Sequence, residues 1–242
     1  MITSTFKRRH SGFRLLLCAA LAMTACSRQE DPAAAAQPAP AAAAAPAAPA
    51  IQPAADVALS PENLARLVRD HSPVLGPANA KVTLVEFLDP ACEACRAYSP
   101  VVKQILFLYP EDVRLVVRFA DFHEGSDQAI RLLHAAREQG KFDVILAALF
   151  EGQDQWASHH QPKIEEAWQI AGKAGLNVSR ARRDAASPQA DALLKLEGED
   201  VIALQVSRTP TFYVNGKTLT VFGAEPLMNL VSAEVKAAKS AP

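Results

Sequence analysis

The chain has 242 residues, half of them hydrophobic, which is enough for one or two domains with a buried core. Charged residues make up 21% of the chain, and the formal net charge is −1. Lys and Arg are dispersed beyond the extreme N-terminus, so the sequence offers no basic patch of the kind that nucleic-acid binding requires. We therefore expect no nucleic-acid partner.

The N-terminus is predicted to be a targeting segment. Residues 7–14 carry four positive charges, and residues 15–25 (LLLCAALAMTA) form a short apolar run. A membrane-spanning helix needs about 20 apolar residues, so this run indicates a signal peptide over residues 1–25. The rest of the chain is then expected to work outside the cytosol, in the periplasm, where disulfide chemistry is possible.

Residues 23–26 (MTAC) resemble a bacterial lipobox, in which a small residue precedes a cysteine that becomes lipidated. The resemblance implies that Cys26 is the acylated first residue of the mature chain. The alternative is ordinary cleavage nearby, for example after Ala22, which would give a soluble periplasmic protein. On either interpretation Cys92 and Cys95 remain as thiols of the mature domain.

A tether is expected between the lipidated cysteine and the folded domain, over residues 26–58. Residues 32–56 are almost entirely Ala and Pro, a composition that disfavours a stable helix and has nothing to bury. At about 3 Å per residue a polyproline-like segment of this length would reach about 75 Å. The folded domain is predicted to occupy residues 59–242.

The first half of that domain predicts a βαβ unit. Ser60 as N-cap and Pro61 at the first helical position start a helix that is expected to run to about residue 71. Residues 82–88 (VTLVEFL) and 113–119 (VRLVVRF) are apolar, β-branched runs typical of buried strands. Residues 92–108 between them have one broad apolar face and are predicted to form a helix.

The second half predicts a helical insertion followed by a ββα unit. Residues 126–206 show no strand pattern, and helices are expected at 126–138, 141–151, 161–174 and 188–204. Residues 211–214 (TFYV) predict a strand, Asn215-Gly216 a tight turn, 219–222 the returning strand and 225–239 a closing helix. The predicted fold class is α/β, in the order βαβ, helical insertion, ββα.

The motif Cys92-Glu93-Ala94-Cys95 opens the helix after the first strand. Unpaired N–H groups at a helix N-terminus favour an anion and lower the pKa of a thiol, and the thiolate is the nucleophile. Cys92 is therefore the expected nucleophile and Cys95 the resolving thiol. Half of a zinc site and a purely structural disulfide stay open as alternatives to a redox pair.

The motif in this context resembles the thioredoxin superfamily, and within it the DsbA-like periplasmic oxidoreductases. Glu86 lies six residues before Cys92 on the predicted strand, where the superfamily often has a buried acid. Pro100 lies at the place of a helix-kinking proline, and Thr209-Pro210 at the place of a cis-proline that faces the redox pair. The resemblance covers residues 60–239, and the helical insertion at about 126–206 favours the DsbA-like branch.

The resemblance implies a thioredoxin fold and thiol:disulfide exchange with protein substrates. Glu86 would move protons to and from Cys95, and Thr209 and Pro210 would bind an extended substrate. A salt-bridged or edge-exposed Glu86 and an ordinary trans Pro210 are the alternatives. No metal or organic cofactor is needed, and a membrane partner, either a quinone-linked oxidase or an electron-importing reductase, would restore the pair. We expect a monomer.

One departure from the family bears on the direction of exchange. Glu93-Ala94 differs from the dipeptides of familiar subclasses, and a Glu beside Cys92 should stabilise its thiolate less than a His would. The sequence therefore predicts a milder oxidant than DsbA. Oxidative folding is the expected activity. The alternatives are a reductase or isomerase of the same fold, or a membrane-tethered peptide-binding module with a structural disulfide. His123 is the histidine most suited to lie beside Cys92, although a surface or capping role is the alternative.

Overall fold

The computed structural model describes residues 59–240. The predicted signal peptide, the lipidation site at Cys26 and the Ala/Pro-rich tether lie outside the described residues and stay predictions. Within residues 59–240, no helix combines the length and the hydropathy that crossing a membrane requires.

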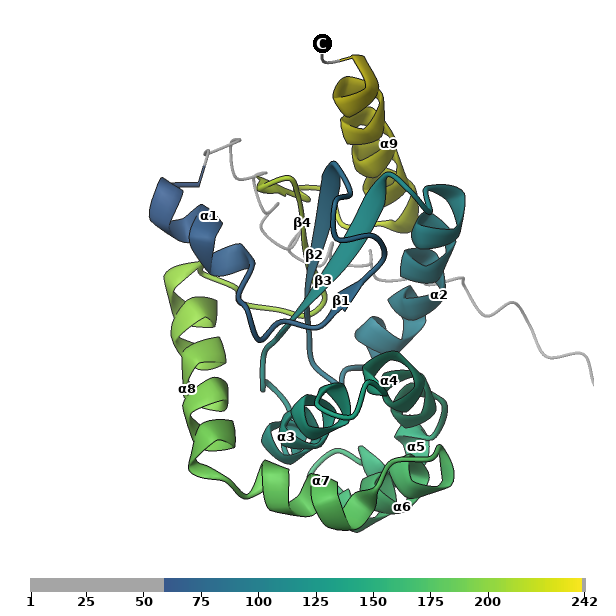
Figure 1. Ribbon diagram of the computed structural model, residues 1–242, viewed down its shortest axis with the longest axis vertical. Helices are drawn as coiled ribbons and strands as arrows, with labels where there is room; N and C mark the ends of the chain where they lie inside the picture. The colour runs from purple at the N-terminus through teal and green to yellow at the C-terminus, as the bar shows by residue number, and fades with distance from the viewer. Residues whose placement is uncertain (1–58, 241–242) are drawn as a thin grey trace, which may run out of the picture. The chain divides into compact units, whose positions relative to one another are not determined.

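A five-stranded sheet in the order β1-β3-β2-β4-β5 forms the centre of the domain (Figure 1). The central strands β2 and β3 are parallel, β4 is antiparallel to β2, β1 is antiparallel to β3, and β5 is antiparallel to β4. The strands are β1 (Val74–Leu75), β2 (Val82–Leu88), β3 (Val113–Phe119), β4 (Thr211–Val214) and β5 (Lys217–Thr218). The predicted strands 82–88, 113–119 and 211–214 are confirmed with these bounds.

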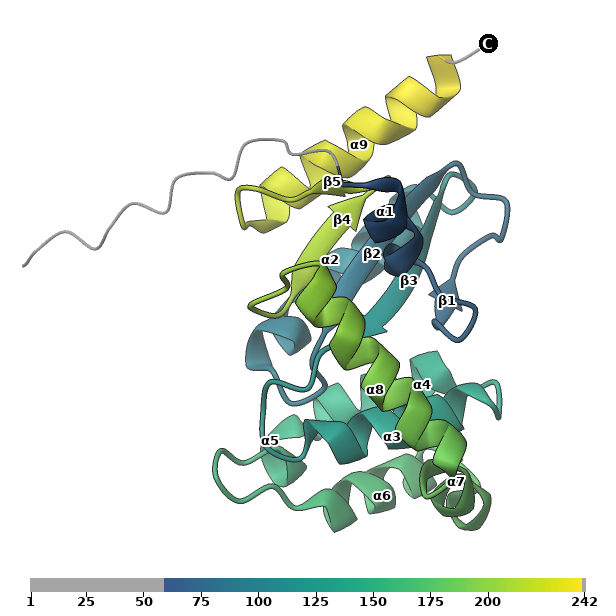
Figure 2. The ribbon, with the colours of Figure 1, turned by 90° about the vertical axis from the view of Figure 1, so that its left-hand side faces the viewer.

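Helices cover both faces of the sheet. Helices α2 (Glu93–Leu108) and α9 (Ala224–Ser240) pack on one face, and α1 (Pro61–Leu67) and α8 (Pro188–Ala203) lie on the other (Figures 1 and 2). Side chains alternate between the faces of a strand. Leu84 and Leu88 of β2 therefore join the core under α2 and α9, and Val85 and Phe87 join the core beside α1 and α8.

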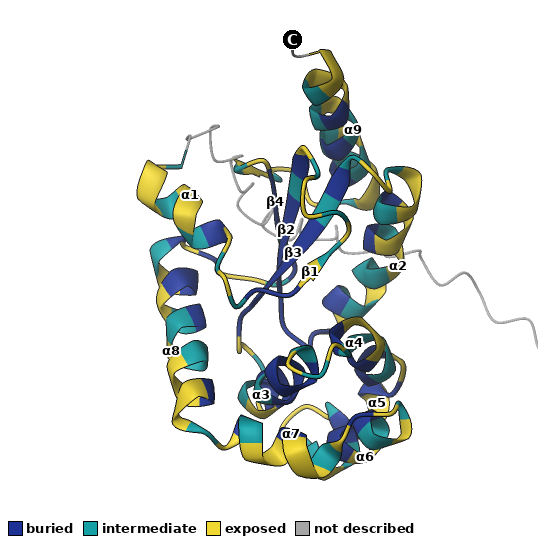
Figure 3. Cartoon of the chain, viewed as in Figure 1, coloured by how far each residue is buried: buried dark blue, intermediate teal, exposed yellow. Residues whose placement is uncertain are grey.

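The helical insertion lies at one end of the sheet (Figures 1 and 2). Trp156 and Trp168 are buried in its core, and Figure 3 shows the dark buried side of these helices facing inward. The insertion begins with α3 (Ser126–Arg137), α4 (Phe142–Glu151), α5 (Gln153–Trp156), α6 (Ile164–Lys173) and α7 (Val178–Ala185), after which α8 returns to the sheet. The predicted all-helical character of residues 126–206 is confirmed.

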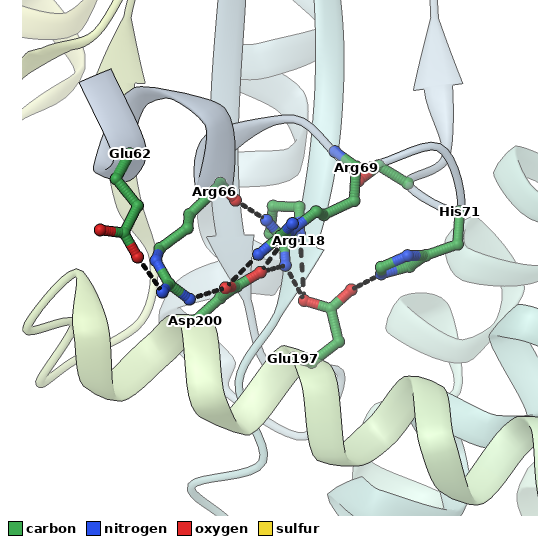
Figure 4. A network of polar contacts seen from close by, with 8 residues as sticks. Glu62, Arg66, Arg69, His71, Arg118, Glu197 and Asp200 are labelled. Atoms are coloured by element: carbon green, nitrogen blue, oxygen red, sulfur yellow. Dashed lines mark hydrogen bonds and ion pairs between the residues drawn. The ribbon is translucent and has the colours of Figure 1, made fainter. Parts of the chain in front are cut away.

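A buried ionic network fastens α8 to β3 (Figure 4). Arg118 of β3 is fully buried and contacts both Glu197 and Asp200 of α8, with Nη2 2.8 Å from Asp200 Oδ2. Arg66 and Arg69, near the end of α1, also bind Asp200. Because the partners come from three elements, the network fixes the last insertion helix against the sheet.

Three predicted boundaries were wrong. The helix expected from residue 161 begins at Ile164. The other two differ for local reasons. The returning strand is β5 at Lys217–Thr218 and not residues 219–222, because Asn215 and Gly216 both have positive φ and form a two-residue turn after which pairing begins at once. The first helix ends at Leu67, since Val68 is already extended and the following residues turn toward Asp200. The short elements β1, α5 and α7 were not predicted.

Candidate redox site

Cys92 is held at the junction between β2 and α2. It is the N-cap residue of α2 and has extended backbone angles, so it lies at the end of the helix where the first N–H groups lack helical partners. Its Sγ donates to the carbonyl oxygen of Thr209 at 3.4 Å, and the Thr209-Pro210 peptide bond is cis, which confirms the prediction for this bond. Cys92 and Cys95 are both free thiols.

The surroundings of Cys92 favour its thiolate. A hydrogen bond from the Cys95 thiol, together with hydrogen bonds from the Thr209 side chain and the backbone N–H groups of Cys95 and Ala94, lowers the pKa of Cys92 to about 5 against the opposing effect of burial. At pH 7 the side chain of Cys92 is therefore mostly an anion. This value is low despite the neighbouring Glu93, whose charge was expected to weaken the thiolate.

Cys95 has the opposite character. It is fully buried in the first turn of α2. Burial raises the pKa of its thiol far above the usual range, and its hydrogen bond to Cys92 and the charge of Glu86 act in the same direction. The pair thus combines one thiolate with one thiol that stays protonated, which is the asymmetry expected of a nucleophile and its resolving partner.

Glu86 lies on the same face of the sheet as Cys95. It belongs to the central strand β2, is only 4% exposed, and has no hydrogen-bond or ion-pair partner within residues 59–240. Burial, and secondly the negative charge at Cys92, raises the pKa of Glu86 to about 8. Neither the salt-bridged nor the edge-exposed alternative describes this residue, which is a buried acid that is mostly neutral at pH 7.

Asp89 organises the loop that carries the motif, and it was not among the predicted site residues. Its carboxylate is fully buried and accepts hydrogen bonds from the backbone N–H of Ala91 at 2.8 Å and from the hydroxyl of Ser126. It also accepts from the backbone N–H groups of Phe122 and His123 at 2.8 and 2.9 Å. One carboxylate therefore joins the residues just before Cys92 to the loop after β3.

The helical insertion also contacts the motif. The buried side chain of Gln153 in α5 donates from Nε2 to the carbonyl oxygens of Pro90 and Cys92, at 2.9 and 3.1 Å. Arg96, in the first turn of α2, pairs with Asp154 at 2.8 Å. No group of three or more His, Cys, Asp or Glu side chains among the described residues is arranged to hold a metal ion.

Comparison with known proteins agrees with this arrangement. The family model described as Thioredoxin matches residues 69–231, which is most of the described domain. The chain belongs to this thioredoxin family. Its helical insertion agrees with the DsbA-like branch that the sequence had suggested.

Solved structures of thioredoxin-fold oxidoreductases are similar to the domain. A thioredoxin-like oxidoreductase from Silicibacter pomeroyi DSS-3 is 28% identical, with a TM-score of 0.62 over 76% of this chain and all of that one. Wolbachia pipientis alpha-DsbA1 is 16% identical, with a TM-score of 0.65 over 73% of this chain and 97% of that one. BdbD from Bacillus subtilis is 22% identical, with a TM-score of 0.58 over 69% and 94%. The latter two share the fold.

The curated relatives contain the thioredoxin-family part within longer proteins. A Na(+)/H(+) antiporter NhaA 3 from Salinispora tropica is 32% identical over 158 residues, or 62% of this chain and 22% of that protein. A Na(+)/H(+) antiporter NhaA from Herminiimonas arsenicoxydans is 31% identical over 150 residues, or 62% and 23%. This chain therefore spans less than a quarter of the length of these relatives.

Within the thioredoxin-family domain, the residues predicted for the site lie together. Cys92, Cys95, Glu86 and Thr209 interact directly or through their charges. Pro210, the residue after Thr209, is buried. Asp89 and Gln153 are the functional residues that sequence reasoning missed. The position of Asp89 at the end of a buried strand was a usable signal, whereas nothing in the sequence distinguished Gln153 from other polar residues of the insertion.

Proposed function

We propose that this protein is an exported thiol:disulfide oxidoreductase that introduces disulfides into protein substrates through Cys92 and Cys95. The observation that carries the proposal is the contrast between the two thiols, with the pKa of Cys92 lowered to about 5 and that of Cys95 raised by burial. A redox pair needs this contrast because Cys92 is the sulfur that leaves when the mixed disulfide is resolved by the substrate, and a leaving sulfur should be a stable thiolate.

The proposed cycle starts from the Cys92–Cys95 disulfide. A substrate thiolate attacks Cys92 Sγ, which forms a mixed disulfide and releases Cys95 with the two electrons of the broken S–S bond. Glu86, which is mostly protonated at pH 7, is suited to give its proton to Cys95. A second substrate thiolate then attacks the substrate sulfur of the mixed disulfide and releases Cys92 as a thiolate. The substrate has gained a disulfide, and the protein has gained two electrons.

Thr209 and Pro210 are proposed to form the docking edge for the substrate. The carbonyl oxygen of Thr209 lies 3.4 Å from Cys92 Sγ, so a strand paired with the backbone at this residue would bring its own cysteine to the nucleophile. Backbone pairing of this kind is tolerant of sequence, which suits an enzyme that acts on many proteins.

The direction of exchange follows from the thiolate. A stabilised thiolate stabilises the reduced form of the protein, and a pair whose reduced form is stable is an oxidant. We therefore propose that a membrane partner of the quinone-linked oxidase type removes the electrons again. An electron-importing reductase is the partner expected if the direction is reversed. No metal or organic cofactor takes part in the steps above.

The proposed location is the periplasm, with the protein held at a membrane by a lipid on Cys26. This rests on the lipobox-like residues 23–26 and on the Ala/Pro-rich segment that follows them. Sodium–proton exchange is named for the longer relatives as whole proteins and is not proposed for this chain.

The equilibrium reduction potential of the Cys92–Cys95 pair, measured against glutathione buffers, tests the proposal. We expect a value nearer to that of DsbA, about −120 mV, than to that of thioredoxin, about −270 mV. A value near −270 mV would indicate a reductase or an isomerase that acts in its reduced state. Failure of the pair to equilibrate would contradict the enzyme and favour a peptide-binding module. A Cys92→Ser variant, which should lose all exchange, is the control.

A further inference from the structure

A histidine from outside the CxxC motif shares a buried carboxylate with the residue that precedes the motif. The motif itself contains an acid, Glu93, and no base. The structure brings His123 from the loop after β3, where its ring nitrogen Nδ1 is 2.8 Å from Asp89 Oδ2. The ring is 30% exposed, so it is neither a buried core histidine nor a free surface one.

The position of His123 is fixed by more than one bond. Its backbone N–H and that of Phe122 donate to the same oxygen of Asp89 as its ring does. The other oxygen of Asp89 accepts from the N–H of Ala91, the residue before Cys92. His123 and the start of the motif are therefore held by one buried carboxylate. His123 and Ala91 also line one surface hollow of about 190 Å³.

The charge of Glu93 is met by a second histidine. His159, in the loop between α5 and α6, has its ring nitrogen Nε2 2.7 Å from Glu93 Oε1. The rings of His123 and His159 are 6.2 Å apart between centroids. Because His159 is hydrogen-bonded to Glu93, it restrains the position of the carboxylate that would otherwise oppose an anion at Cys92.

We propose that His123, oriented by Asp89, is the cationic partner of the Cys92 thiolate, and that His159 restrains the opposing charge of Glu93. The inference rests on the proposed redox function and deepens it. The cation that stabilises the nucleophile is supplied by the loop after β3 and by the helical insertion, and not by the dipeptide between the two cysteines.

The charges around His123 support this assignment. Asp89 faces it from the end of β2, Cys92 and Glu93 from the start of α2, Glu124 from its own loop, and His159 and His160 from the α5–α6 loop. Burial alone would lower the pKa of His123, but the hydrogen bond and charge of Asp89, with the charges at Cys92 and Glu93, raise it. The protonated ring is thus favoured when Cys92 is a thiolate.

The test follows the alkylation rate of Cys92 in the reduced full-length protein from pH 4 to 9, with the modified cysteine identified by mass spectrometry. We expect two steps in the wild-type profile, one for Cys92 and one for His123. His123→Gln should give one step, with the pKa of Cys92 raised by about one unit, since an opposite charge nearby shifts a pKa by this order. His123→Lys should keep the low pKa of Cys92 and lose the second step, because its charge does not titrate in this range.

Two controls separate charge from structure. His160→Asn changes a histidine of the same hollow, and Asn suits the positive φ of 66° at this residue, so its profile should match the wild type. His159→Gln should raise the pKa of Cys92 when Glu93 is present and leave it unchanged in a Glu93→Gln background.

Identical profiles for wild type, His123→Gln and His123→Lys would overturn the inference. Glutathione exchange measured on the same samples separates the two proposals. If the wild-type protein exchanges with glutathione and the His123 variants show the same pH profile of Cys92 alkylation, only the role of His123 is contradicted. A wild-type protein that does not exchange contradicts the redox function itself.

Discussion

Replacing Glu86 with Gln should stabilise the reduced protein at neutral pH, and the gain should grow until the pH reaches about 8. The carboxyl group is buried in the central strand, and its pKa is raised from an ordinary 4.5 to about 8. Between these two values the folded protein keeps a proton that the unfolded chain has lost. Stability therefore falls as the pH rises through this window and is level above it. Glutamine has nearly the same shape and does not titrate.

The magnitude follows from the size of the window. One pKa unit corresponds to 1.36 kcal/mol, so the destabilisation by Glu86 is close to zero at pH 4.5, about 3 kcal/mol at pH 7 and about 5 kcal/mol above pH 8. The buried amide of the Glu86→Gln variant costs about 1 kcal/mol at every pH, which shifts the whole curve and leaves its slope unchanged. The slope is therefore the quantity to measure.

Urea unfolding of the reduced protein at pH 4.5, 6, 7 and 8, followed by the fluorescence of the two buried tryptophans, gives this slope. Glu111→Gln, at an exposed glutamate, is the matched control and should follow the wild type at every pH. The difference between Glu86→Gln and wild type should grow by about 3 kcal/mol from pH 4.5 to pH 7. An equal difference at pH 4.5 and pH 8 would refute the argument, because the carboxyl would then not be a buried acid with a raised pKa.

Three further outcomes are expected. Cys95→Ala should trap Cys92 as a mixed disulfide with glutathione, visible by mass spectrometry, whereas rapid release of glutathione would show that Cys95 is not the resolving thiol. Gln153→Leu should lower the free energy of urea unfolding by about 1–3 kcal/mol, because the carbonyls of Pro90 and Cys92 lose a buried donor. An unchanged unfolding midpoint would show that these two hydrogen bonds do not stabilise the fold. Asp200→Asn should cost about 3–5 kcal/mol at pH 7 by leaving Arg118 short of a partner. Since the arginines hold the pKa of Asp200 well below its usual range, this cost should shrink as the pH falls below about 4, and a cost independent of pH would contradict it.

Local patterns predicted the parts of the fold that local physics controls. The β-branched runs of β2 and β3 are buried on both faces, which produces a continuous apolar signal and fixed their bounds correctly. The predicted position of β5 was too late in the chain, because pairing with β4 starts at Lys217, directly after the two-residue turn at Asn215 and Gly216. Residues 219–222 have a strand-like composition, yet Val221 and Phe222 are largely exposed and do not pair.

The site was predictable where its residues are close in the chain and, through the family resemblance, at Thr209 and Pro210. The spacing of Cys92, Cys95 and Glu86 around one strand and one helix gave the pair and its buried acid. The bonds that join Asp89 to His123 and Gln153 to Cys92 span 34 and 61 residues. No local pattern records such contacts, because they depend on how the insertion folds back. The expectation that Glu93 would weaken the thiolate did not take into account the contact with His159, which is also distant in the chain.

These long-range contacts change the role of the helical insertion. A spacer would need only to connect β3 to β4, yet the α5 region directs three polar side chains to the motif and its flanking residues: Gln153 to the carbonyls of Pro90 and Cys92, Asp154 to Arg96 and His159 to Glu93. The carbonyl oxygen of Cys92 also accepts the first backbone hydrogen bond of α2, from the N–H of Arg96. The hydrogen bond from Gln153 to the same oxygen therefore helps to fix the N-terminal end of the helix beside the thiolate. Variation in the α5 region would therefore alter the reactivity of Cys92 while leaving the four residues of the motif unchanged. Subclasses defined by the dipeptide alone would then misjudge the oxidising power of proteins like this one.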